Sequence, residues 1–300
     1  MISGGAKIES VLALIESVKD YKVLFIGDSI TDEYHYVEAL GKSPKEHVIS
    51  CRYLKEEVFH GGTAAAASHA RNFCKQVDTF VSPTAVRKVR FVDLANLRKV
   101  SEIHYGACDQ LEGSIPSGAL CASSAYDAVV VTDFGHGAIG GDMIQKLCQA
   151  PFVAVAAQTN SSNIGFNLIT KYPKADYIVI DEPEARLAAA DRDSHIEDVI
   201  RKLAYGRCGK FIVTHGPNGA YGYENGKFHH CKSHTDLVRD TMGAGDAFFA
   251  VTAPMAKTGK MEDLLLIGNA AGALKTQIIG HRKSITKEAL TEYLWNSRTK

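Results

Sequence analysis

A glycine-rich run late in the chain has the residue types of an anion-binding turn. Residues 240–246 read DTMGAGD, and the apolar run AFFA follows directly. Gly243, Ala244 and Gly245 carry at most a methyl side chain, so three backbone N–H groups could converge there at the start of a helix. Converging amides and the helix dipole suit a phosphate oxygen. The run is therefore a candidate phosphate-binding loop, although close packing would also account for small residues here.

Asp246 stands in the first turn of the expected helix, beside the candidate anion site. A carboxylate repels a phosphate, so anion binding alone does not explain this residue. Its position suits a general base that takes a proton from an attacking hydroxyl during phosphoryl transfer. The alternative is that Asp246 only caps the helix.

Other polar residues follow the expected strands. Ligands of doubly wound sheets bind at the carboxyl ends of the strands, where such residues would meet. Grouped carboxylates favour metal, hydroxyl or ammonium chemistry, and helix capping would account for part of them. The residues at these strand ends are Asp28, Asp32, Asp133, Asp181 and Glu184, with Thr214 and Gly216 after a further strand.

The elements that must position these residues alternate along the chain. Short apolar runs rich in valine and isoleucine predict buried strands, and apolar residues at helical spacing predict helices between them. Such a pattern indicates an α/β fold with a mostly parallel central sheet flanked by helices. The expected strands are 21–28, 126–135, 151–158, 175–181 and 210–216, and the expected helices are 8–18, 62–77, 138–149, 184–205, 245–258 and 262–276.

Two stretches, at about 33–60 and 84–107, differ from this pattern. They carry more polar, alternating runs such as VISCRYL and VRKVRFVD, which are typical of half-exposed antiparallel strands. We expect them to form a small sheet that projects from the α/β body. Because there is no long linker or repeat, residues 1–300 are expected to form a single domain.

Composition excludes several partners. Lys plus Arg and Asp plus Glu both number 34, so no global field attracts nucleic acid or an anionic membrane. No run approaches the roughly 20 apolar residues of a membrane span, and no secretory signal precedes the first helix. The seven scattered cysteines indicate free thiols in a reducing compartment. The expected location is therefore cytoplasmic and the expected ligand a small molecule.

Taken in order, the motifs resemble those of the ribokinase-like (PfkB) carbohydrate kinases. DTMGAGD is similar to the C-terminal signature of that family. The other matching blocks are GDSITDEY (27–34) for the first-strand motif, HGG (60–62) for the double glycine, DEPE (181–184) in the place of N-x-x-E, VTHGPNGAY (213–221) for the strand and turn beside the nucleotide, and NAAGALKT (269–276) for the helix along the adenine pocket. The blocks span nearly the whole chain.

This resemblance implies an ATP-dependent sugar kinase with a ribokinase-like fold and a small β-sheet lid. Lid sheets with exposed edges often pair into homodimers. Asp246 would be the general base, and Gly243, Ala244 and Gly245 would form the anion hole. The remaining implied contacts are Asp32, Gly61, Gly62 and Asp133 to the sugar, Thr214, Gly216, Gly219, Asn269 and Ala273 to ATP, and Glu184 and Asp181 to Mg²⁺ through water.

Within the family, GDSITDEYHYVEALGKSPKEHV resembles the kinases of D-glycero-D-manno-heptose 7-phosphate, which act in ADP-heptose and lipopolysaccharide synthesis. This branch implies phosphorylation at O1, and six basic residues could neutralise the sugar phosphate or simply be solvated: Lys42, Lys45, Arg52, Arg87, Lys88 and Arg90. Some heptose enzymes are bifunctional, but within these 300 residues we expect no room for a nucleotidyltransferase.

Three departures concern the acceptor and metal sites. Ala65 and Ala66 stand where the family usually has a sugar-contacting asparagine, Lys45 follows Ser43-Pro44 in place of glutamate, and Asp181 replaces the asparagine of N-x-x-E. A kinase for another sugar or a nucleoside, or a non-catalytic sugar or nucleotide sensor, therefore remains an alternative.

Two further motifs have less probable functional interpretations. GHGAIG (135–140) fits the dinucleotide pattern G-x-G-x-x-G, but the following strand ends in Gln158 and Asn160, not in an acidic residue. HHCKSH (229–234) contains possible metal ligands, but neighbouring side chains on a strand point to opposite faces. We expect neither a nicotinamide site nor a metal site from them.

Overall fold

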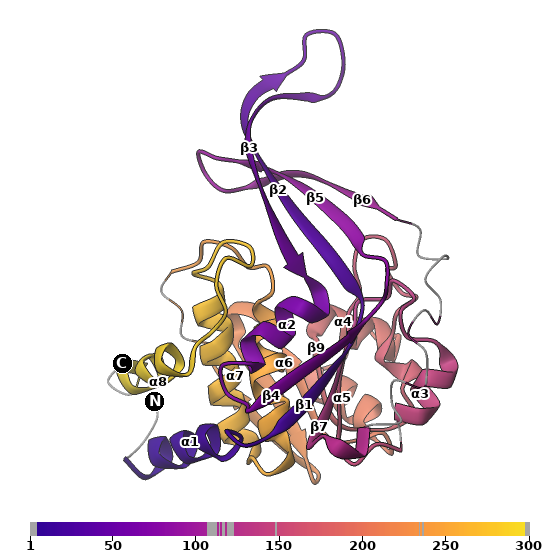
Figure 1. Ribbon diagram of the computed structural model, residues 1–300, viewed down its shortest axis with the longest axis vertical. Coiled ribbons are helices and arrows are strands. Elements are labelled where there is room, and N and C mark those ends of the chain that lie inside the picture. The colour runs from indigo at the N-terminus through magenta and orange to yellow at the C-terminus, as the bar shows by residue number, and fades with distance from the viewer. Residues whose placement is uncertain are drawn as a thin grey trace.

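The computed structural model describes residues 5–106, 113, 115, 118, 123–147, 149–233, 235 and 237–297. Two sheets organise this part of the chain, one central and one projecting from it (Figure 1). No helix in the described ranges is long and apolar enough to cross a membrane.

The central sheet has the strand order β12-β11-β10-β9-β8-β7-β1-β4. The six strands from β10 to β4 run parallel, whereas β11 and β12 form an antiparallel hairpin at one edge. β7 and β8 are buried along their whole length, as expected for strands covered on both faces. The strands are β1 (Lys22–Gly27), β4 (Gln76–Val81), β7 (Ala128–Asp133), β8 (Val153–Ala157), β9 (Ala175–Asp181), β10 (Cys208–Thr214), β11 (Ala220–Glu224) and β12 (Lys227–Cys231).

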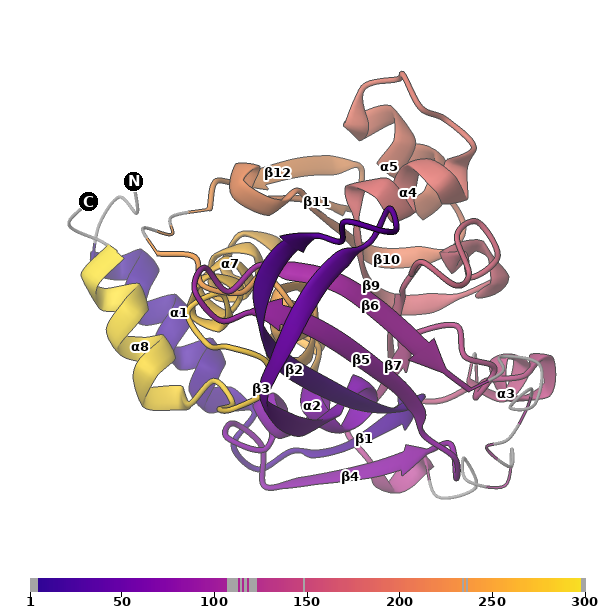
Figure 2. The same cartoon turned by 90° about the horizontal axis from the view of Figure 1, so that it is seen from above.

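Helices cover both faces of this sheet, and each face has its own apolar cluster. On one face pack α1 (Gly5–Ser17), α2 (Gly62–Ala70), α6 (Ala244–Thr252), α7 (Met261–Lys275) and α8 (Lys287–Asn296). On the other pack α3 (Gly141–Leu147), α4 (Glu182–Ala189) and α5 (Ile196–Ala204). Short 3₁₀ helices are η3 (Ile169–Lys171), η4 (Gly216–Asn218) and η5 (Pro254–Lys257). The α/β fold predicted from the strand and helix pattern is confirmed (Figure 2).

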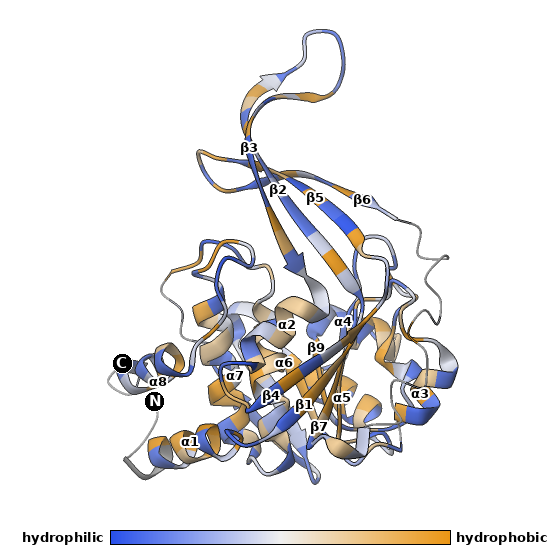
Figure 3. Cartoon of the chain, in the orientation of Figure 1, coloured by the Kyte–Doolittle hydropathy of each residue, from blue (hydrophilic) through white to orange (hydrophobic). Residues whose placement is uncertain are grey.

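The second sheet has the order β3-β2-β5-β6 and rises above the α/β body in Figure 1. Hydrophilic and hydrophobic residues are mixed along its strands (Figure 3). Its strands are β2 (Ser29–Lys42), β3 (Ile49–Gly61), β5 (Val86–Asp93) and β6 (Lys99–Tyr105). The prediction that all its strands are antiparallel is wrong for β2 and β5, which pair in parallel. The reason is that β2 follows β1 and β5 follows β4 almost directly, and β1 and β4 are themselves parallel neighbours.

Two helix predictions also need correction. The segment predicted as a helix over 62–77 is helical only over α2, and residues 76–81 form the edge strand β4, whose mixed sequence QVDTFV lacks a buried-strand pattern. The segment 184–205 is two helices, because Ala190 ends α4 in the left-handed conformation with φ 49° and His195 begins α5.

Candidate active site

A cavity of about 190 Å³ opens at the carboxyl ends of β8, β9 and β10, where a doubly wound sheet binds its ligands. It brings together seven of the residues that the sequence predicted for catalysis, metal and nucleotide. These are Asp181, Glu184, Thr214, Gly243, Ala244, Gly245 and Asp246, and Gln158, Thr159 and Thr241 complete the polar lining.

The glycine-rich loop leads directly into α6. Gly243 is the N-cap residue and has the left-handed φ of 73°, which favours glycine because it has no Cβ. A Cβ on Gly245, by contrast, would meet no atom within 4 Å. The N-terminus of α6 therefore faces the cavity with Gly245 open to it, the arrangement that an anion needs.

Asp246 lies in the first turn of α6, half-buried in the cavity wall. The side-chain amide of Gln158 donates a hydrogen bond to its Oδ1. Burial raises the pKa of the Asp246 carboxyl, and the hydrogen bond from Gln158, together with nearby His281 and Lys275, offsets part of that rise. Raising the pKa of a carboxylate toward neutrality makes it a better proton acceptor.

Asp181 and Glu184 form a capping box at the start of α4. The N–H of Glu184 donates to Asp181 Oδ1, and the N–H of Asp181 donates to Glu184 Oε2, each at 2.8 Å. Thr159 N–H donates to Glu184 Oε1, also at 2.8 Å. Burial, followed by the charge of Asp181, raises the pKa of Glu184 to about 8. The two carboxylates thus have a structural role as well as a place on the cavity wall.

This pair fits a magnesium ion held mainly by water and substrate, which is the usual mode for Mg²⁺. Within the described residues, no group of three or more His, Cys, Asp or Glu side chains could enclose a metal ion by itself. His229 and His230 lie on opposite faces of β12, where His229 pairs with Glu262 at 3.1 Å and His230 contacts the Asn218 carbonyl at 3.0 Å. His234 of the same motif lies outside the described residues.

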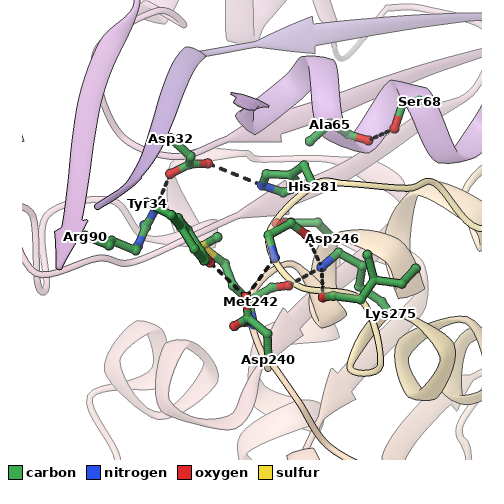
Figure 4. Close-up of polar contacts among 12 residues, drawn as sticks. Asp32, Tyr34, Ala65, Ser68, Arg90, Asp240, Met242, Asp246, Lys275 and His281 are labelled. Atoms are coloured by element: carbon green, nitrogen blue, oxygen red, sulfur yellow. Dashed lines mark hydrogen bonds and ion pairs between the residues drawn. The ribbon is translucent and has the colours of Figure 1, made fainter. Parts of the chain in front are cut away.

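Asp32 lies on the face of β2 that is turned toward the α/β body, and it is almost fully buried. Arg90 of β5 donates to its Oδ1, and His281 Nε2 lies 3.3 Å from its Oδ2 (Figure 4). Burial alone would raise the pKa of Asp32, but His281 and Arg90 lower it to about 2. Asp32 is therefore a fixed anion between the two sheets.

The double glycine lets the chain pass close to this carboxylate. A Cβ on Gly61 would overlap the Asp32 side chain, and Gly62 has φ +56° with the Asp28 carbonyl 2.8 Å from its Cβ position. Gly61 therefore lies beside the Asp32 carboxylate, and Gly62 lies beside the Asp28 carbonyl. Packing against Asp32 and Asp28 is already a sufficient reason for glycine at these positions.

Asp133 does not line the 190 Å³ cavity, although its backbone carbonyl accepts the N–H of Gln158, which does, at 2.8 Å. Its carboxylate accepts hydrogen bonds from the Tyr172 hydroxyl and the Gly135 N–H, and it pairs with Lys171. Asp28 is similarly engaged, by the N–H groups of Phe134 and Ala138 at 2.8 and 3.2 Å. Asp28 thus holds the loop 134–138 in place, and that loop is the start of the dinucleotide-like GHGAIG motif.

Two of the residues predicted for the nucleotide meet at the end of β12. Asn269 of α7 donates to the Cys231 carbonyl at 2.9 Å, and a Cβ on Gly219 would overlap the same carbonyl. Ala273 lies one helical turn after Asn269, and Gly216 begins η4 with φ +50°. A second cavity, of about 650 Å³, lies between the segment after β12, the end of α7 and α8. Its lining includes Ser233, Thr235, Leu237, Leu274, Gln277 and residues of α8.

The comparisons with known proteins agree with this geometry. Residues 148–288 match the pfkB family carbohydrate kinase, a stretch that contains the capping box, the glycine-rich loop and Asp246. Residues 148–288, just under half of the chain, therefore carry the similarity to pfkB family carbohydrate kinases. Enzymes of this family are phosphotransferases that act on sugar hydroxyls.

Three curated relatives are weakly similar to this chain. Probable fructokinase-6, chloroplastic, of Arabidopsis thaliana is 26% identical over 216 residues, which are 68% of this chain and 52% of the relative. Bifunctional protein HldE is 25% identical over 303 residues in Rhodopseudomonas palustris and 24% over 314 in Bradyrhizobium diazoefficiens, covering 87% and 89% of this chain. The matches span 61% and 62% of those two proteins, so the chain corresponds to between half and two thirds of each relative.

Solved structures share the fold at low identity. Ribokinase of Arabidopsis thaliana with ribose and ATP has a TM-score of 0.69 at 17% identity, covering 92% of this chain and 99% of its own. Ribokinase of Thermotoga maritima gives 0.71 at 17%, with 92% and 100% covered. Phosphofructokinase-2 of Escherichia coli in complex with potassium gives 0.70 at 14%, with 93% and 100% covered. The predicted ribokinase-like fold is thereby confirmed.

Several residues in or near the candidate site were not predicted from the sequence. Gln158 was noticed only as the residue that ends an expected strand. Lys275 and His281 were not singled out, although a lysine among the apolar residues of the NAAGALKT helix was a signal for the first. Nothing in the sequence around His281 indicated that it would lie beside Asp32.

Proposed function

We propose that this chain transfers the terminal phosphate of ATP to a hydroxyl of a sugar or sugar phosphate. The observation that carries the proposal is the position of Asp246 in the first turn of α6, on the wall of a cavity that it shares with the glycine-rich loop and the Asp181–Glu184 pair. A base, a set of amides and two carboxylates around one small space are the parts that phosphoryl transfer needs.

In the proposed reaction, Asp246 takes the proton of the acceptor hydroxyl as its oxygen forms a bond to the γ-phosphorus. The bond from that phosphorus to the oxygen of ADP breaks, and ADP leaves with the electron pair. The amides of residues 243–245 stabilise the charge that develops on the transferring group. The second sheet would shield this space from water, so that ATP hydrolysis does not compete.

The residues around the cavity support a position for the nucleotide and for the metal. Asp181 and Glu184 would hold Mg²⁺ through water, and the bound ion would neutralise phosphate charge. Thr214 lines the phosphate end of the cavity. The adenine and ribose of ATP would lie between the turn at Gly216–Gly219 and the face of α7 that carries Asn269 and Ala273.

The finer proposal for the acceptor is D-glycero-D-manno-heptose 7-phosphate, phosphorylated at O1. It is supported by the motif resemblance and by the weak similarity to HldE proteins. Asp32 would bind a sugar hydroxyl. On the same inner face of the second sheet, Lys88 pairs in register with Asp32 and is buried without an ion pair among the described residues, so it could receive the sugar phosphate.

The other lid-side cations support this assignment less well. Arg52 pairs with Glu38, Arg87 with Glu33 and Arg90 with Asp32, while Lys42 and Lys45 lie exposed near the far end of the sheet. Ala66 is buried in the apolar core and Ala65 is nearly so, so neither replaces the polar contact of an asparagine. The absence of the asparagine favours an acceptor other than the heptose 7-phosphate, so another sugar or a nucleoside is the second candidate.

ADP release across a panel of acceptors tests these proposals. The panel contains the heptose 7-phosphate, its unphosphorylated heptose, fructose, ribose and adenosine, and Asp246→Asn is the control for contaminating kinases. The highest kcat/KM with the heptose 7-phosphate would support the proposed acceptor. A higher kcat/KM with another acceptor would support the kinase activity and contradict the heptose assignment. Tight ligand binding without turnover for any acceptor would contradict the kinase and indicate a sensor.

We also propose that the second sheet pairs with that of another copy. β3 is an edge strand with exposed apolar side chains, including Ile49, Tyr53 and Val58, and such edges pair readily. Light scattering during gel filtration should give a dimer mass, and Tyr53→Lys combined with Val58→Lys should give a monomer. A monomeric wild-type protein at all concentrations would contradict the pairing.

A further inference from the structure

Lys275, the last residue of α7, has no solvent exposure. Burying an ammonium group is costly unless polar partners replace its water. Its pKa is lowered, chiefly by that burial. The buried ammonium therefore depends on nearby polar groups that replace its water.

The partners of the ammonium are backbone carbonyls. Lys275 Nζ donates to the carbonyl oxygens of Met242 at 2.7 Å and Gly280 at 2.8 Å, with the Ile278 oxygen at 3.5 Å (Figure 4). No carboxylate of the described residues forms an ion pair with it. A cluster of carbonyl oxygens around one positive charge is the environment in which proteins place a dehydrated monovalent cation such as potassium.

The carbonyls belong to the two segments that flank the site. Met242 precedes the glycine-rich loop, and residues 278–280 lead to His281, which contacts Asp32. Asp240 joins the same two segments through their amides, because its carboxylate accepts the N–H of Met242 at 3.1 Å and that of Gly280 at 2.9 Å. Lys275 and Asp240 thus bind the carbonyl and the amide groups of the same two residues.

The lysine also lies directly against the loop. The Cβ position of Gly243 is 3.3 Å from Lys275 Cε and 3.7 Å from Nζ. A shift of the ammonium would break its hydrogen bond to the carbonyl of Met242, the residue before the α6 N-cap Gly243, and would release the loop whose amides face the cavity. The contacts connect the charge to the position of the anion site.

We propose that the Lys275 ammonium acts as a built-in monovalent cation that holds the glycine-rich loop against residues 278–281, so that activity needs no soluble monovalent ion. Lys275 is in this view a positioning residue, since it does not reach the reacting atoms. The proposal rests on the proposed kinase function for its activity readout, but the carbonyl cage itself can be tested without any substrate.

The first test uses the wild-type protein. Its kcat is measured in buffers whose only monovalent cation is tetramethylammonium, which is too large for the cage, and again with KCl at equal ionic strength. We expect no potassium activation beyond about twofold, whereas misplacement of an anion site typically costs about 10²-fold. A saturable activation of about tenfold or more would overturn the proposal.

The second test opens the cage. In Lys275→Ala the ammonium and most of its stem are absent, so potassium or ammonium ions can occupy the carbonyl cluster. We expect kcat to fall by about 10²-fold in tetramethylammonium and to recover by at least about tenfold with KCl or NH₄Cl. Lys275→Met is the matched variant, since its side chain fills the stem's volume without a charge, and we expect the same loss without recovery. Lys257→Ala, an exposed lysine of η5, controls for loss of a positive charge.

The third test has no activity readout. The Tm of Lys275→Ala should rise by roughly 2–4 °C when KCl replaces tetramethylammonium chloride at equal ionic strength, because an ion that binds only the folded state stabilises it. The Tm of the wild type and of Lys275→Met should not respond. If no substrate is turned over but the Tm responds as described, the cage is supported and the kinase function is not. Equal responses of all three proteins would overturn the cage.

Discussion

His281 Nε2 lies 3.3 Å from Oδ2 of Asp32, and this contact joins the segment that follows α7 to the second sheet. The partners are separated by nearly 250 residues of sequence and come from the two parts of the molecule that enclose the proposed acceptor. Because Arg90 holds the other oxygen of Asp32, the carboxylate is oriented from both sides.

His281→Ala should therefore weaken acceptor binding more than nucleotide binding. A hydrogen bond to a charged group contributes about 1.5–3 kcal/mol, so we expect the KM for the acceptor to rise about tenfold and the KM for ATP to change less than twofold. Steady-state kinetics with each substrate varied in turn would measure both. His229→Ala, a histidine paired with Glu262, is the control. Equal changes in both KM values would argue against an acceptor-side role.

Asp246→Asn should abolish most turnover while leaving nucleotide binding intact. Asparagine keeps the size of the side chain but cannot accept the hydroxyl proton, and the loss of a general base costs about 10²–10⁴-fold in kcat. Rapid-quench or ADP-release assays measure the rate, and calorimetry measures ATP affinity. A variant within a few-fold of wild type would rule out Asp246 as the base.

The pH profile provides an independent test of the same residue. Burial raises the pKa of Asp246 above its ordinary value of 3.8, and only the deprotonated form can act as a base. The acidic limb of kcat/KM should therefore lie at higher pH than an exposed aspartate would give. Gln158 favours the charged form through its hydrogen bond, so Gln158→Ala should move the limb to still higher pH. An acidic limb unchanged by Gln158→Ala would show that Gln158 does not influence the pKa of the catalytic base.

The Asp32–Arg90 pair should contribute to acid stability. The pKa of Asp32 is lowered from 3.8 to about 2 in the folded protein, so its stabilising contribution is complete above pH 3.8 and is lost as the pH falls toward 2. Arg90→Gln leaves a buried carboxylate with one partner fewer, and breaking a buried pair costs about 3–5 kcal/mol. Urea unfolding at pH 7 should show that loss, and the difference from wild type should shrink below pH 4. An equal difference at pH 7 and pH 2.5 would mean that the charge of Asp32 is not involved.

Gly243 and Gly245 should respond differently to substitution. Gly243→Ala places a Cβ in the left-handed conformation, which costs about 1–2 kcal/mol, and its Cβ would lie 3.3 Å from Lys275 Cε. Gly245→Val meets no neighbouring atom near its Cβ, so stability should change little, but its side chain would enter the cavity and lower turnover. Thermal unfolding and kcat measured on both variants check this. Full activity of Gly245→Val would show that no phosphate approaches that position.

Local spacing explains why part of the site was predictable. In DTMGAGD the three small residues and the aspartate lie within one turn of a helix start, so their relative positions are nearly fixed once the helix forms. The same holds for Asp181 and Glu184, which are three residues apart in the sequence and form the capping box of α4. The apolar strand runs likewise predicted the central sheet, because strands buried on both faces leave a continuous apolar pattern.

The remaining features depend on contacts between distant segments. Asp133 and Asp181 both end parallel strands, but Lys171 and Tyr172 surround only the first. The parallel pairing of β2 and β5 follows from the neighbouring positions of β1 and β4 in the sheet, which no local pattern records.

The sequence by itself determined the α/β fold and the glycine-rich loop with Asp246, because periodicity and short spacing act within single elements. Only the tertiary structure decided that Gln158 binds Asp246, that His281 binds Asp32 and that the Lys275 ammonium lies among the carbonyls of Met242 and Gly280. These contacts require the packing of α6, α7 and both sheets, and their free energy arises only when segments far apart in the chain have come together.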